Sequence, residues 1–368
     1  MFETLDQGFI TAREPAEPNP VAGCSRCALA KNGELLVTYS VQSALGVNDF
    51  VPVLARSTDG GRKWAEQGPI WPGLADRFSI VGSISRAPSC ELFIYGIRIP
   101  IDVRGESFWS PETGGMKQND IFWARSTDNG RTWTEPAVIP KPTLGAAEAP
   151  GAMCVTRTGR WLACYAPYKT LDPTVVVDRG QIVVVASVDE GSTWTGQSML
   201  RFAAADSSGA EAWVIELADG RLLGTCWHIN DKEGPDYPNA YALSTDGGDS
   251  WSPTRSTGIL GQSTALAALP DGRALFVYNQ RKQRVPGVRL AVVDPDEEEF
   301  GVQADELIWR AETPTQTGTS ADHVDWQDFA FGEPSITVLA NGELLATLWC
   351  IQPAGQGIRF VRLRLPSA

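Results

Sequence analysis

Three glutamates in this chain stand at similar places ahead of short apolar runs, and they are its clearest candidates for chemistry. Glu148, Glu211 and Glu333 each lie nine to eleven residues before the glycine of the next polar turn. If these runs are equivalent strands of a repeated architecture, their first residues converge at one place. Two converging carboxyl groups are what glycoside hydrolysis requires: one protonates the leaving oxygen and the other attacks the sugar or activates water. The same groups can also cap strand ends or accept hydrogen bonds from turn amides, so both interpretations stay open.

Two further apolar runs carry a different residue at the corresponding place. Gly23 and Gln262 each lie ten residues before a turn glycine. Carboxylates therefore occupy three of the five aligned positions. Gln262 is a candidate for substrate contact, because an amide both donates and accepts hydrogen bonds.

A repeated turn motif identifies the elements that would position these residues. The pattern Ser-x-Asp-x-Gly-x-x-Trp occurs four times, starting at Ser57, Ser126, Ser187 and Ser244. In such a turn the aspartate bonds backbone N–H groups, the glycine supplies a positive φ, and the tryptophan anchors the loop on apolar surface. Successive central aspartates are 69, 61 and 57 residues apart, which is the spacing of repeated supersecondary units.

A second element recurs between these turns, and it sets the number of units at six. Each copy is an apolar run, a short turn and another apolar run; the copies span 24–40, 80–97, 149–166, 212–227, 263–278 and 334–349. A degenerate fifth turn motif is expected at Asp294-Pro295-Asp296, with Phe300 in place of tryptophan. The pattern predicts an all-β fold, a six-bladed β-propeller with four antiparallel strands per blade.

Composition favours a single domain over residues 1–368. The chain is 43% hydrophobic and contains 36 glycines and 25 prolines, as expected for many short strands joined by turns. A propeller grows by adding blades around one axis, so 368 residues do not require a second domain. No Pro/Ser-rich linker or charge block divides the sequence.

Charge and apolar patterning argue against several classes of partner. The formal net charge of −13 disfavours nucleic acid, whose phosphates require a basic surface. No apolar run approaches 18 residues, so no membrane association is expected. The N-terminal residues lack the basic and apolar regions of a signal peptide, which predicts a cytoplasmic protein, with a trimmed secretion signal as the alternative. The expected partner is a small-molecule or oligosaccharide substrate, and the oligomeric state stays open.

The cysteine and histidine content predicts neither a disulfide framework nor a metal site. Seven cysteines are an odd number without scaffold-like spacing, and most lie inside apolar runs. Cys24 and Cys27 have the spacing of half a zinc site, but no second pair follows, and residues three apart on a strand face opposite sides. With only two histidines, no metal or other cofactor is expected.

The repeated turn is the Asp box, and the chain resembles the sialidase (neuraminidase) superfamily, whose six-bladed propellers carry BNR repeats. In that family the boxes staple the blades away from the ligand face, so they indicate the fold rather than an activity. Glu211, before an apolar run that ends at Asp219-Gly220, resembles the family glutamate that assists a tyrosine nucleophile. Asp49, in Val47-Asn48-Asp49-Phe50, falls where the family has its acid/base aspartate; an ordinary loop acid is the alternative.

The family's substrate-binding arginines are not reproduced in this sequence. Sialidases hold the substrate carboxylate with three arginines; the matching places here hold Gly23 with Arg26 nearby, Trp227-His228, and a stretch with Arg281, Arg284 and Arg289. The tyrosine nucleophile belongs at the start of the last inner strand, where this chain has Glu333. A carboxylate nucleophile and a missing arginine clamp suit a neutral sugar better than an anionic one.

The resemblance and its departures together predict an exo-acting glycoside hydrolase with altered sugar specificity, as in related arabinan-cleaving propellers. Glu211 and Glu333 are the leading catalytic residues, with Asp49 or Glu148 as acid or electrostatic partner. Sugar contacts are expected from the aromatic residues near these glutamates and from polar neighbours: Trp109, Trp227, Trp326, His228, Gln262, Arg26, Arg281 and Arg284.

Three alternatives remain. The chain can be a diverged true sialidase, with the third arginine at Arg281 or Arg284. It can be a uronate lyase that uses a His/Tyr pair, His228 with Tyr237. It can also be a non-catalytic propeller that binds carbohydrate or protein, because fold alone does not determine function.

Overall fold

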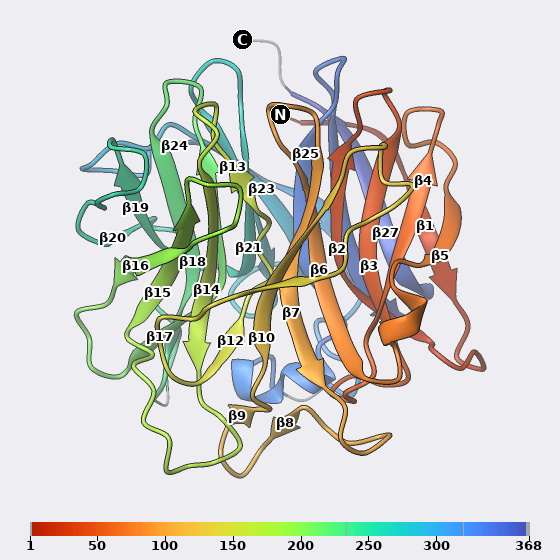
Figure 1. Cartoon of the computed structure of the whole chain (residues 1–368). Helices are drawn as coiled ribbons and strands as arrows, with labels where there is room; N and C mark the ends of the chain where they lie inside the picture. Colours follow the sequence, from red (N-terminus) through yellow and green to blue (C-terminus); the bar gives the residue numbers. More distant parts are fainter. Residues whose placement is uncertain (1, 233, 319, 366–368) are drawn as a thin grey trace.

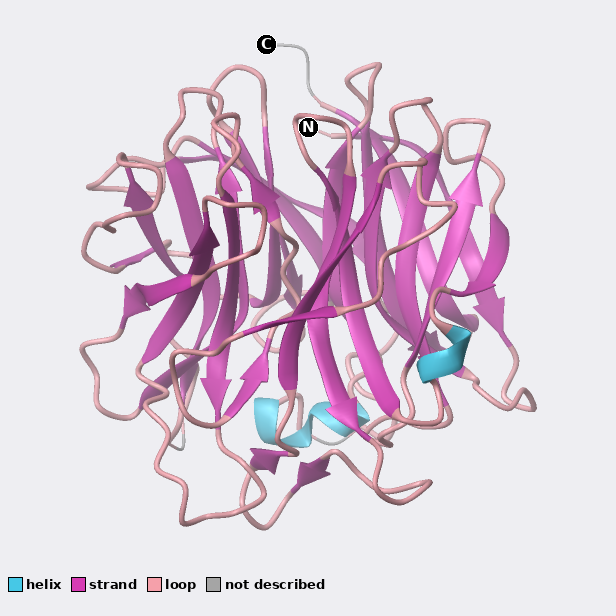
Figure 2. Ribbon diagram, in the orientation of Figure 1, coloured by secondary structure: helices cyan, strands magenta, loops and turns pink. Residues whose placement is uncertain are grey.

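The computed structural model describes residues 2–232, 234–318 and 320–365, and its strands are arranged as six antiparallel sheets around a central axis (Figure 1). Five sheets have four strands, and in the remaining one the innermost strand is divided into two short segments. In the part of the chain that the structure describes, helix is confined to two short 3-10 turns (Figure 2). The predicted six-bladed β-propeller is therefore confirmed.

The blades follow one another along the chain, and in each of the first five the innermost strand comes first. From the axis outward, the first three blades consist of β2 (Val21–Leu29), β3 (Leu35–Gln42), β4 (Val51–Ser57) and β5 (Ala65–Pro69); β6 (Phe78–Arg86), β7 (Leu92–Pro100), β10 (Asp120–Ser126) and β11 (Ala137–Ile139); and β12 (Ala146–Glu148) with β13 (Cys154–Val155), β14 (Trp161–Tyr168), β15 (Gln181–Ser187) and β16 (Thr195–Arg201).

The last three blades repeat this order, except that the outermost strand of the sixth comes from the start of the chain. Their strands are β17 (Ser207–Glu216), β18 (Leu222–Asn230), β19 (Ala240–Ser244) and β20 (Arg255–Ser256); β21 (Gln262–Ala268), β22 (Ala274–Gln280), β23 (Gly287–Val293) and β24 (Val302–Arg310); and β25 (Phe331–Val338), β26 (Leu344–Gln352), β27 (Gly355–Arg364) and β1 (Glu3–Arg13).

Pairing of β1 with β27 closes the ring. The register runs from Glu3 opposite Arg364 to Arg13 opposite Gln356, and Arg13 also forms an ion pair with Glu66 of the first blade at 2.6 Å. The first and last segments of the chain thus share one sheet. The sequence repeats did not predict this pairing, because β1 carries neither of the recurring elements.

Burial follows the position of a strand within its blade. All eight residues of β3 are buried, whereas four of the five residues of the outermost strand β5 are exposed. Middle strands pack against neighbouring blades on both faces, which explains why they are almost continuously apolar rather than alternating. Between the second and third blades, for example, the rings of Phe93 and Trp123 lie 4.8 and 4.9 Å from that of Trp161.

The Asp boxes form the hydrogen-bonded turns that their sequences predict. In the first, Asp59 Oδ1 accepts hydrogen bonds from Ser57 Oγ (2.9 Å) and from the backbone N–H of Lys63 (2.9 Å). Ser57 Oγ accepts from the N–H of Gly61, and Trp64 Nε1 donates back to the Gly61 carbonyl. The boxes beginning at Ser126, Ser187 and Ser244 repeat the serine–aspartate bond at 2.8 Å.

The degenerate fifth box keeps the turn without the tryptophan. Asp296 Oδ1 accepts hydrogen bonds from the N–H groups of Glu298 (2.7 Å) and Glu299 (2.8 Å). Phe300 is buried and packs 5.0 Å from the ring of Tyr241, so phenylalanine takes the anchoring role of the missing indole.

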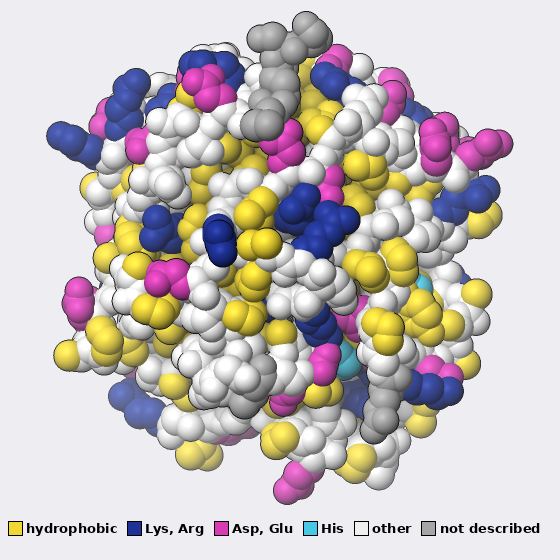
Figure 3. Space-filling view, turned by 180° about the vertical axis from the view of Figure 1, so that it is seen from behind, with side chains coloured by type: hydrophobic (Ala, Val, Ile, Leu, Met, Phe, Trp, Pro, Cys, Tyr) yellow, Lys and Arg dark blue, Asp and Glu magenta, His cyan; other side chains and the backbone are white. Residues whose placement is uncertain are grey.

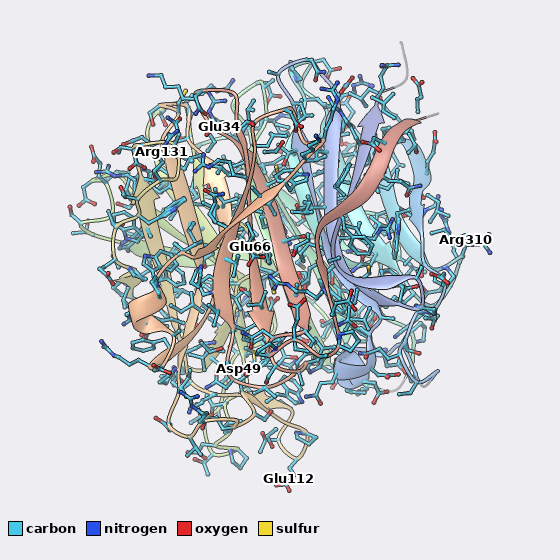
Figure 4. The ribbon with its side chains drawn as sticks, turned by 90° about the vertical axis from the view of Figure 1, so that its right-hand side faces the viewer. Glu34, Asp49, Glu66, Glu112, Arg131 and Arg310 are labelled. Carbon is cyan, nitrogen blue, oxygen red and sulfur yellow. The ribbon has the colours of Figure 1, made fainter. Side chains whose placement is uncertain are left out.

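Loops at the end of the propeller opposite the boxes carry the remaining elements. They are η1 (Pro72–Leu74), the hairpin of β8 (Trp109–Ser110) and β9 (Gly115–Met116), and η2 (His323–Asp328). The hairpin and η2 lie below the strands in Figure 1. Figure 4 shows the same polarity: Glu34 and Arg131 mark the box end, and Asp49 and Glu112 the other. Within the described ranges, no helix has the length and apolar character needed to cross a membrane.

Candidate active site

A pocket of about 210 Å³ opens at the loop end of the central channel. Its floor contains Glu148, Glu211 and Glu333, and the hairpin of the second blade and η2 contribute to its walls. The three glutamates singled out in the sequence are therefore brought together by three different blades.

A β-bulge in four of the inner strands turns Glu211 and Glu333, but not Glu148, toward the axis. Cys24, Glu211, Ser263 and Glu333 all have positive φ, between 23° and 57°. Each lies at a register shift between the inner strand and its neighbour. A bulge inserts one residue and re-aims the side chain next to it. Non-glycine residues rarely adopt positive φ, and such backbone gathers at functional sites.

The bulges correct part of the alignment made from the sequence. Cys24 and Ser263, rather than Gly23 and Gln262, are the counterparts of Glu211 and Glu333. All four lie nine residues before their turn glycine, a constant spacing that the looser sequence alignment did not resolve.

Each glutamate accepts a hydrogen bond from the next blade around the ring. Glu148 Oε2 accepts from the backbone N–H of Glu211 at 3.0 Å, and Glu211 Oε1 accepts from Ser263 Oγ at 3.3 Å. Glu333 Oε2 accepts from the N–H of Cys24 at 2.8 Å, across the junction between the last and first blades. Glu148 and Glu333 thus accept from backbone amides, as the structural interpretation expected, and Glu211 accepts from a serine hydroxyl; all three also line the pocket.

Burial and mutual repulsion raise the pKa of Glu148 and of Glu211. Desolvation is the main reason that the pKa of Glu148 is raised to about 8; the charge of Glu333 acts in the same direction, while the hydrogen bond from Glu211 and the charge of Arg26 oppose it. Desolvation is also the main reason that the pKa of Glu211 is well above its usual range, followed by repulsion from Glu148 and Glu333. Perturbed carboxyl groups that share a cleft are typical of acid–base sites.

The carboxyl groups differ in access to the pocket. Glu211 is only 8% exposed, and its Oε2 atom is buried without a hydrogen-bond partner in the described part of the chain. Glu148 and Glu333 are partly exposed. Of the three glutamates, Glu148 and Glu333 are therefore the two that a ligand reaches more directly.

Arg281 also lines the floor, with its nitrogens bonded to the protein. Nε donates to the carbonyl of Phe331 at 3.1 Å, Nη1 donates to Gln262 Oε1 at 3.1 Å, and Nη2 donates to the same Phe331 carbonyl. Its guanidinium carbon lies 3.9 Å from the ring centroid of Phe329. Burial lowers the pKa of Arg281 to about 9, and the charges of Glu211 and Glu333 oppose this change.

Arg26 lies beneath the floor rather than in the pocket. Its Nε donates to the carbonyl of Pro150 at 3.2 Å, and its Nη1 donates to the carbonyl of Glu333 at 3.0 Å. The guanidinium packs over Trp213, and the residue lines a separate cavity of about 500 Å³ toward the box end of the channel. Arg26 thus separates the two cavities and places a positive charge below the glutamates.

Aromatic rings form the walls of the pocket. Phe108 lies 5.5 Å from both Phe50 and Trp326, and Trp109 lies 6.1 Å from Trp326 and 5.5 Å from Tyr168, all between ring centroids. The opposite side is formed by Trp227, Phe329 and Trp349. Aromatic faces of this kind stack on the C–H faces of sugars and exclude water from the floor.

Four other residues proposed from the sequence lie outside the pocket lining. Asp49 Oδ1 accepts from the N–H of Ser43 at 3.2 Å within its own loop, although its neighbour Phe50 lines the pocket. Arg284 is half-exposed and pairs with Asp305 at 2.9 Å. Gln262 reaches the site only through Arg281 and otherwise donates to the carbonyl of Ala321.

His228 is the fourth, and it faces away from the pocket while its neighbour Trp227 lines it. Its ring is stacked between Phe202 (4.3 Å) and Tyr237 (4.6 Å). Burial lowers the pKa of His228 to about 4, so the imidazole is neutral near pH 7. Alternation of side chains along β18 explains the orientation, because successive residues of a strand point to opposite faces.

Sequence reasoning missed several residues that line the pocket, including Cys24, Phe50, Phe108 and Met116. Phe108 and Met116 belong to the hairpin insertion in the second blade, which is bridged to the first blade through Val47–Ser107 and to the third through Met116–Thr170. The length of that insertion was a usable signal, but contacts between loops of different blades have no local pattern in the sequence.

The outer surface carries acidic and basic side chains in interspersed groups, and no broad basic area is visible on the face in Figure 3. The net charge of −13 is consistent with this distribution.

Comparison with known proteins gives the family. Residues 107–313 match the model of the BNR repeat-like domain. A sialidase of Bacteroides fragilis (strain YCH46) is 25% identical over 270 residues, which cover 66% of this chain and 45% of that protein. The chain thus matches somewhat under half the length of this curated relative.

Solved structures share the whole fold at low sequence identity. A protein of unknown function from Dyadobacter fermentans has a TM-score of 0.75 at 19% identity, covering 99% of both chains. The Hadza microbial sialidase Hz136 has a TM-score of 0.68 at 17% identity, covering 98% of this chain and 68% of that one. An α-L-arabinanase of Penicillium chrysogenum complexed with arabinobiose has a TM-score of 0.63 at 16% identity, covering 98% of both. The chain belongs to the BNR repeat-like family, with the propeller of the sialidase superfamily.

Proposed function

We propose that this protein is an exo-acting glycoside hydrolase that removes a terminal sugar lacking a carboxylate. The observation that carries the proposal is the meeting of Glu148, Glu211 and Glu333 at the floor of one small aromatic pocket. In addition, the pKa of Glu148 is raised to about 8, so this carboxyl group holds a proton near pH 7 and is able to give it away.

In the proposed reaction the proton of Glu148 passes to the glycosidic oxygen as the bond to the anomeric carbon breaks. Glu333 acts from the other side of the floor, either by attacking that carbon or by taking a proton from the water that does. Glu211 is buried between them and adjusts their charge. The sequence favoured Glu211 as one of the two leading residues; its low exposure favours Glu148 in the role of acid.

Two features support a sugar without a carboxylate. Of the described residues that line the pocket, Arg281 is the only lysine or arginine, and each of its three nitrogens already donates to a protein oxygen. A substrate carboxylate would therefore meet three glutamates and one arginine whose Nε and Nη2 already share the Phe331 carbonyl. The similarity to an arabinanase propeller agrees with a sugar that lacks a carboxylate.

A diverged sialidase is the second candidate, supported by the sialidase relative and by Arg281 at the floor. A lyase that depends on His228 has less support, because that ring is stacked outside the pocket.

The test is a panel of chromogenic glycosides, including an arabinofuranoside and a sialoside, assayed with wild type, Glu148→Gln and Glu333→Gln. Each glutamine variant is expected to lower kcat/KM on the accepted glycoside by at least about 100-fold, the usual contribution of a positioned acid or base. Both should keep their thermal transition within a few degrees, because the amide oxygen still accepts the backbone hydrogen bond.

Glu216→Gln is the matched control. Glu216 also sits on an inner strand and accepts a backbone hydrogen bond, from Arg157 at 2.8 Å, but it lines the cavity at the box end. It should leave turnover unchanged. Cleavage of the sialoside alone would favour the sialidase, and cleavage of no glycoside together with binding of sugars would favour a non-catalytic propeller.

A further inference from the structure

One carboxyl oxygen at the floor of the pocket lacks a hydrogen-bond partner among the described residues. Glu211 is 8% exposed, and its Oε2 atom has no hydrogen-bond partner among the described residues. Leaving such an atom unpaired is unfavourable, and structures usually satisfy buried polar atoms with a neighbour, a water or a ligand. At the floor of a pocket, an unpaired carboxyl group of this kind indicates that the ligand completes its hydrogen bonding, and a positive charge in the ligand would do so by favouring the carboxylate over the protonated form.

The arrangement of the carboxyl groups does not suit a metal ion. In the described ranges, no three His, Cys, Asp or Glu side chains gather closely enough to hold one. The three glutamates instead lie around the floor, each oriented by a hydrogen bond from a different neighbouring strand. Groups spread in this way suit a donor carried on a larger organic ligand better than a compact cation.

The walls of the pocket are aromatic. Phe50, Phe108, Trp326, Trp109 and Tyr168 form a continuous series of ring contacts between 5.5 and 6.1 Å on one side. Aromatic faces attract cations through their negative π surfaces, most strongly when water is excluded. The pocket already contains one such contact, the Arg281 guanidinium over Phe329 at 3.9 Å.

A positive charge in the ligand would also relieve repulsion within the site. The pKa values of Glu148 and Glu211 are raised first by burial, and then by the charge of Glu333, together with Glu148 in the case of Glu211. A cation beside Glu211 and Glu333 offsets the repulsion between them, because it favours the ionised form of the carboxyl groups that it contacts.

We propose that the pocket binds a cationic ligand, and, resting on the proposed hydrolase function, that the terminal sugar it accepts carries a protonated amine. The ammonium group lies between the glutamates at the floor, and the C–H faces of the ring lie against the aromatic walls. Specificity for the amine comes from Glu211 and Glu333, and the aromatic residues contribute both to the charge preference and to the fit of the ring.

The test is isothermal titration calorimetry with two matched pairs of probes. Choline and its neutral isostere 3,3-dimethylbutan-1-ol differ only in charge, and D-glucosamine and D-glucose differ in the amine. Each cation is expected to bind at least about tenfold more tightly than its neutral partner, as one charge-assisted contact together with a cation–aromatic contact implies. Glu333→Gln should reduce this preference to less than about threefold, and Trp326→Leu should weaken choline binding more than binding of the neutral isostere.

Glu216→Gln, at the opposite end of the channel, should keep the full preference and shows that the effect belongs to the pocket. Equal affinity for the charged and neutral probes, or a preference that survives Glu333→Gln, overturns the proposal. The two proposals fail separately. If a neutral glycoside is cleaved and no preference for the amine is found, the amine proposal is wrong and the hydrolase proposal stands. If the amine is preferred and no glycoside is cleaved, the hydrolase proposal is wrong and the binding of a cationic ligand stands.

Discussion

The carboxyl group of Glu148 and the backbone of Glu211 are joined across the boundary between the third and fourth blades. Glu148 Oε2 accepts a hydrogen bond from the N–H of Glu211 at 3.0 Å, although the two residues are 63 positions apart in the chain. The same glutamate holds a positive-φ bulge of the neighbouring strand and lines the pocket. Structural and chemical roles therefore coincide in one side chain, and substitutions at this position can separate them.

The first prediction concerns stability and pH. Glu148 has an unfolded pKa of about 4.5 and a folded pKa of about 8, so between these values the unfolded chain loses the proton that the folded protein keeps. The free energy of unfolding should fall as pH rises through this window, by about 1.4 kcal/mol for each pH unit and by a few kcal/mol in all. The pKa of Glu211 is raised as well, so Glu148→Gln removes one of two such groups and should make this dependence shallower by about 1.4 kcal/mol for each pH unit in urea unfolding measured from pH 4.5 to 8.5.

Glu216→Gln serves as the control and should keep the wild-type slope. If the free energy of unfolding fell equally steeply with pH in wild type and in Glu148→Gln, the proton would be held elsewhere in the cluster.

The second prediction is the pH profile of turnover. If Glu148 is the acid, kcat/KM should decline above about pH 8, where its carboxyl group loses the proton that the leaving oxygen needs. Steady-state rates on the accepted glycoside between pH 5 and 10 measure this decline in kcat/KM. Residual activity of Glu148→Gln should lack it, and a profile that stays flat to pH 10 would remove Glu148 from the acid role.

The third prediction concerns the Asp boxes. Asp128 Oδ1 accepts hydrogen bonds from the N–H groups of Arg131 and Thr132 at 2.9 Å, and hydrogen bonding lowers its pKa to about 2. Asp128→Ala leaves these donors without their partner and should destabilise the protein by about 1–2 kcal/mol, as loss of a capping side chain does. Turnover should be unchanged, because the box lies at the end of the propeller opposite the pocket.

Calorimetric unfolding and the glycoside assay together measure this effect. Since the folded pKa is depressed, the contribution of Asp128 is present above pH 3.8 and is lost as pH falls toward 2. Asp76→Ala is the control: its carboxylate pairs with Arg104, and both side chains are highly exposed, so it should change stability by less than ~0.5 kcal/mol. If Asp76→Ala lowered the free energy of unfolding as much as Asp128→Ala, this would argue against a special role for the box.

The fourth prediction concerns closure of the ring. Removal of residues 2–13 deletes β1 and exposes the hydrogen-bonding edge of β27 over the register Glu3–Arg13. We expect loss of the cooperative thermal transition, or aggregation, because an open ring leaves its last sheet with a free edge. Circular dichroism and size-exclusion chromatography report both outcomes.

Glu3→Gln, which removes only the exposed ion pair with Arg364, should behave like wild type. A truncated protein with a wild-type transition would show that β1 is not needed for closure.

Local chemistry made the architecture readable from the sequence. Each Asp box is held by bonds within about eight residues, as between Ser57, Asp59 and Lys63, so its residue types alone identify it. The recurring apolar runs identified the inner strands, and their starts pointed to Glu148, Glu211 and Glu333, all of which line the pocket. These features depend on short-range geometry, and the amino-acid order by itself determines them.

Contacts between distant segments decided the rest. The bulges that place Cys24 and Ser263, and not Gly23 and Gln262, beside the glutamates arise from strand register. The walls come from loops of several blades, and the raised pKa of Glu148 comes from burial and from a charge 185 positions away at Glu333. Closure by β1 joins opposite ends of the chain. Register, burial and loop packing exist only once the ring has formed, because each depends on residues that are neighbours in space and not in sequence.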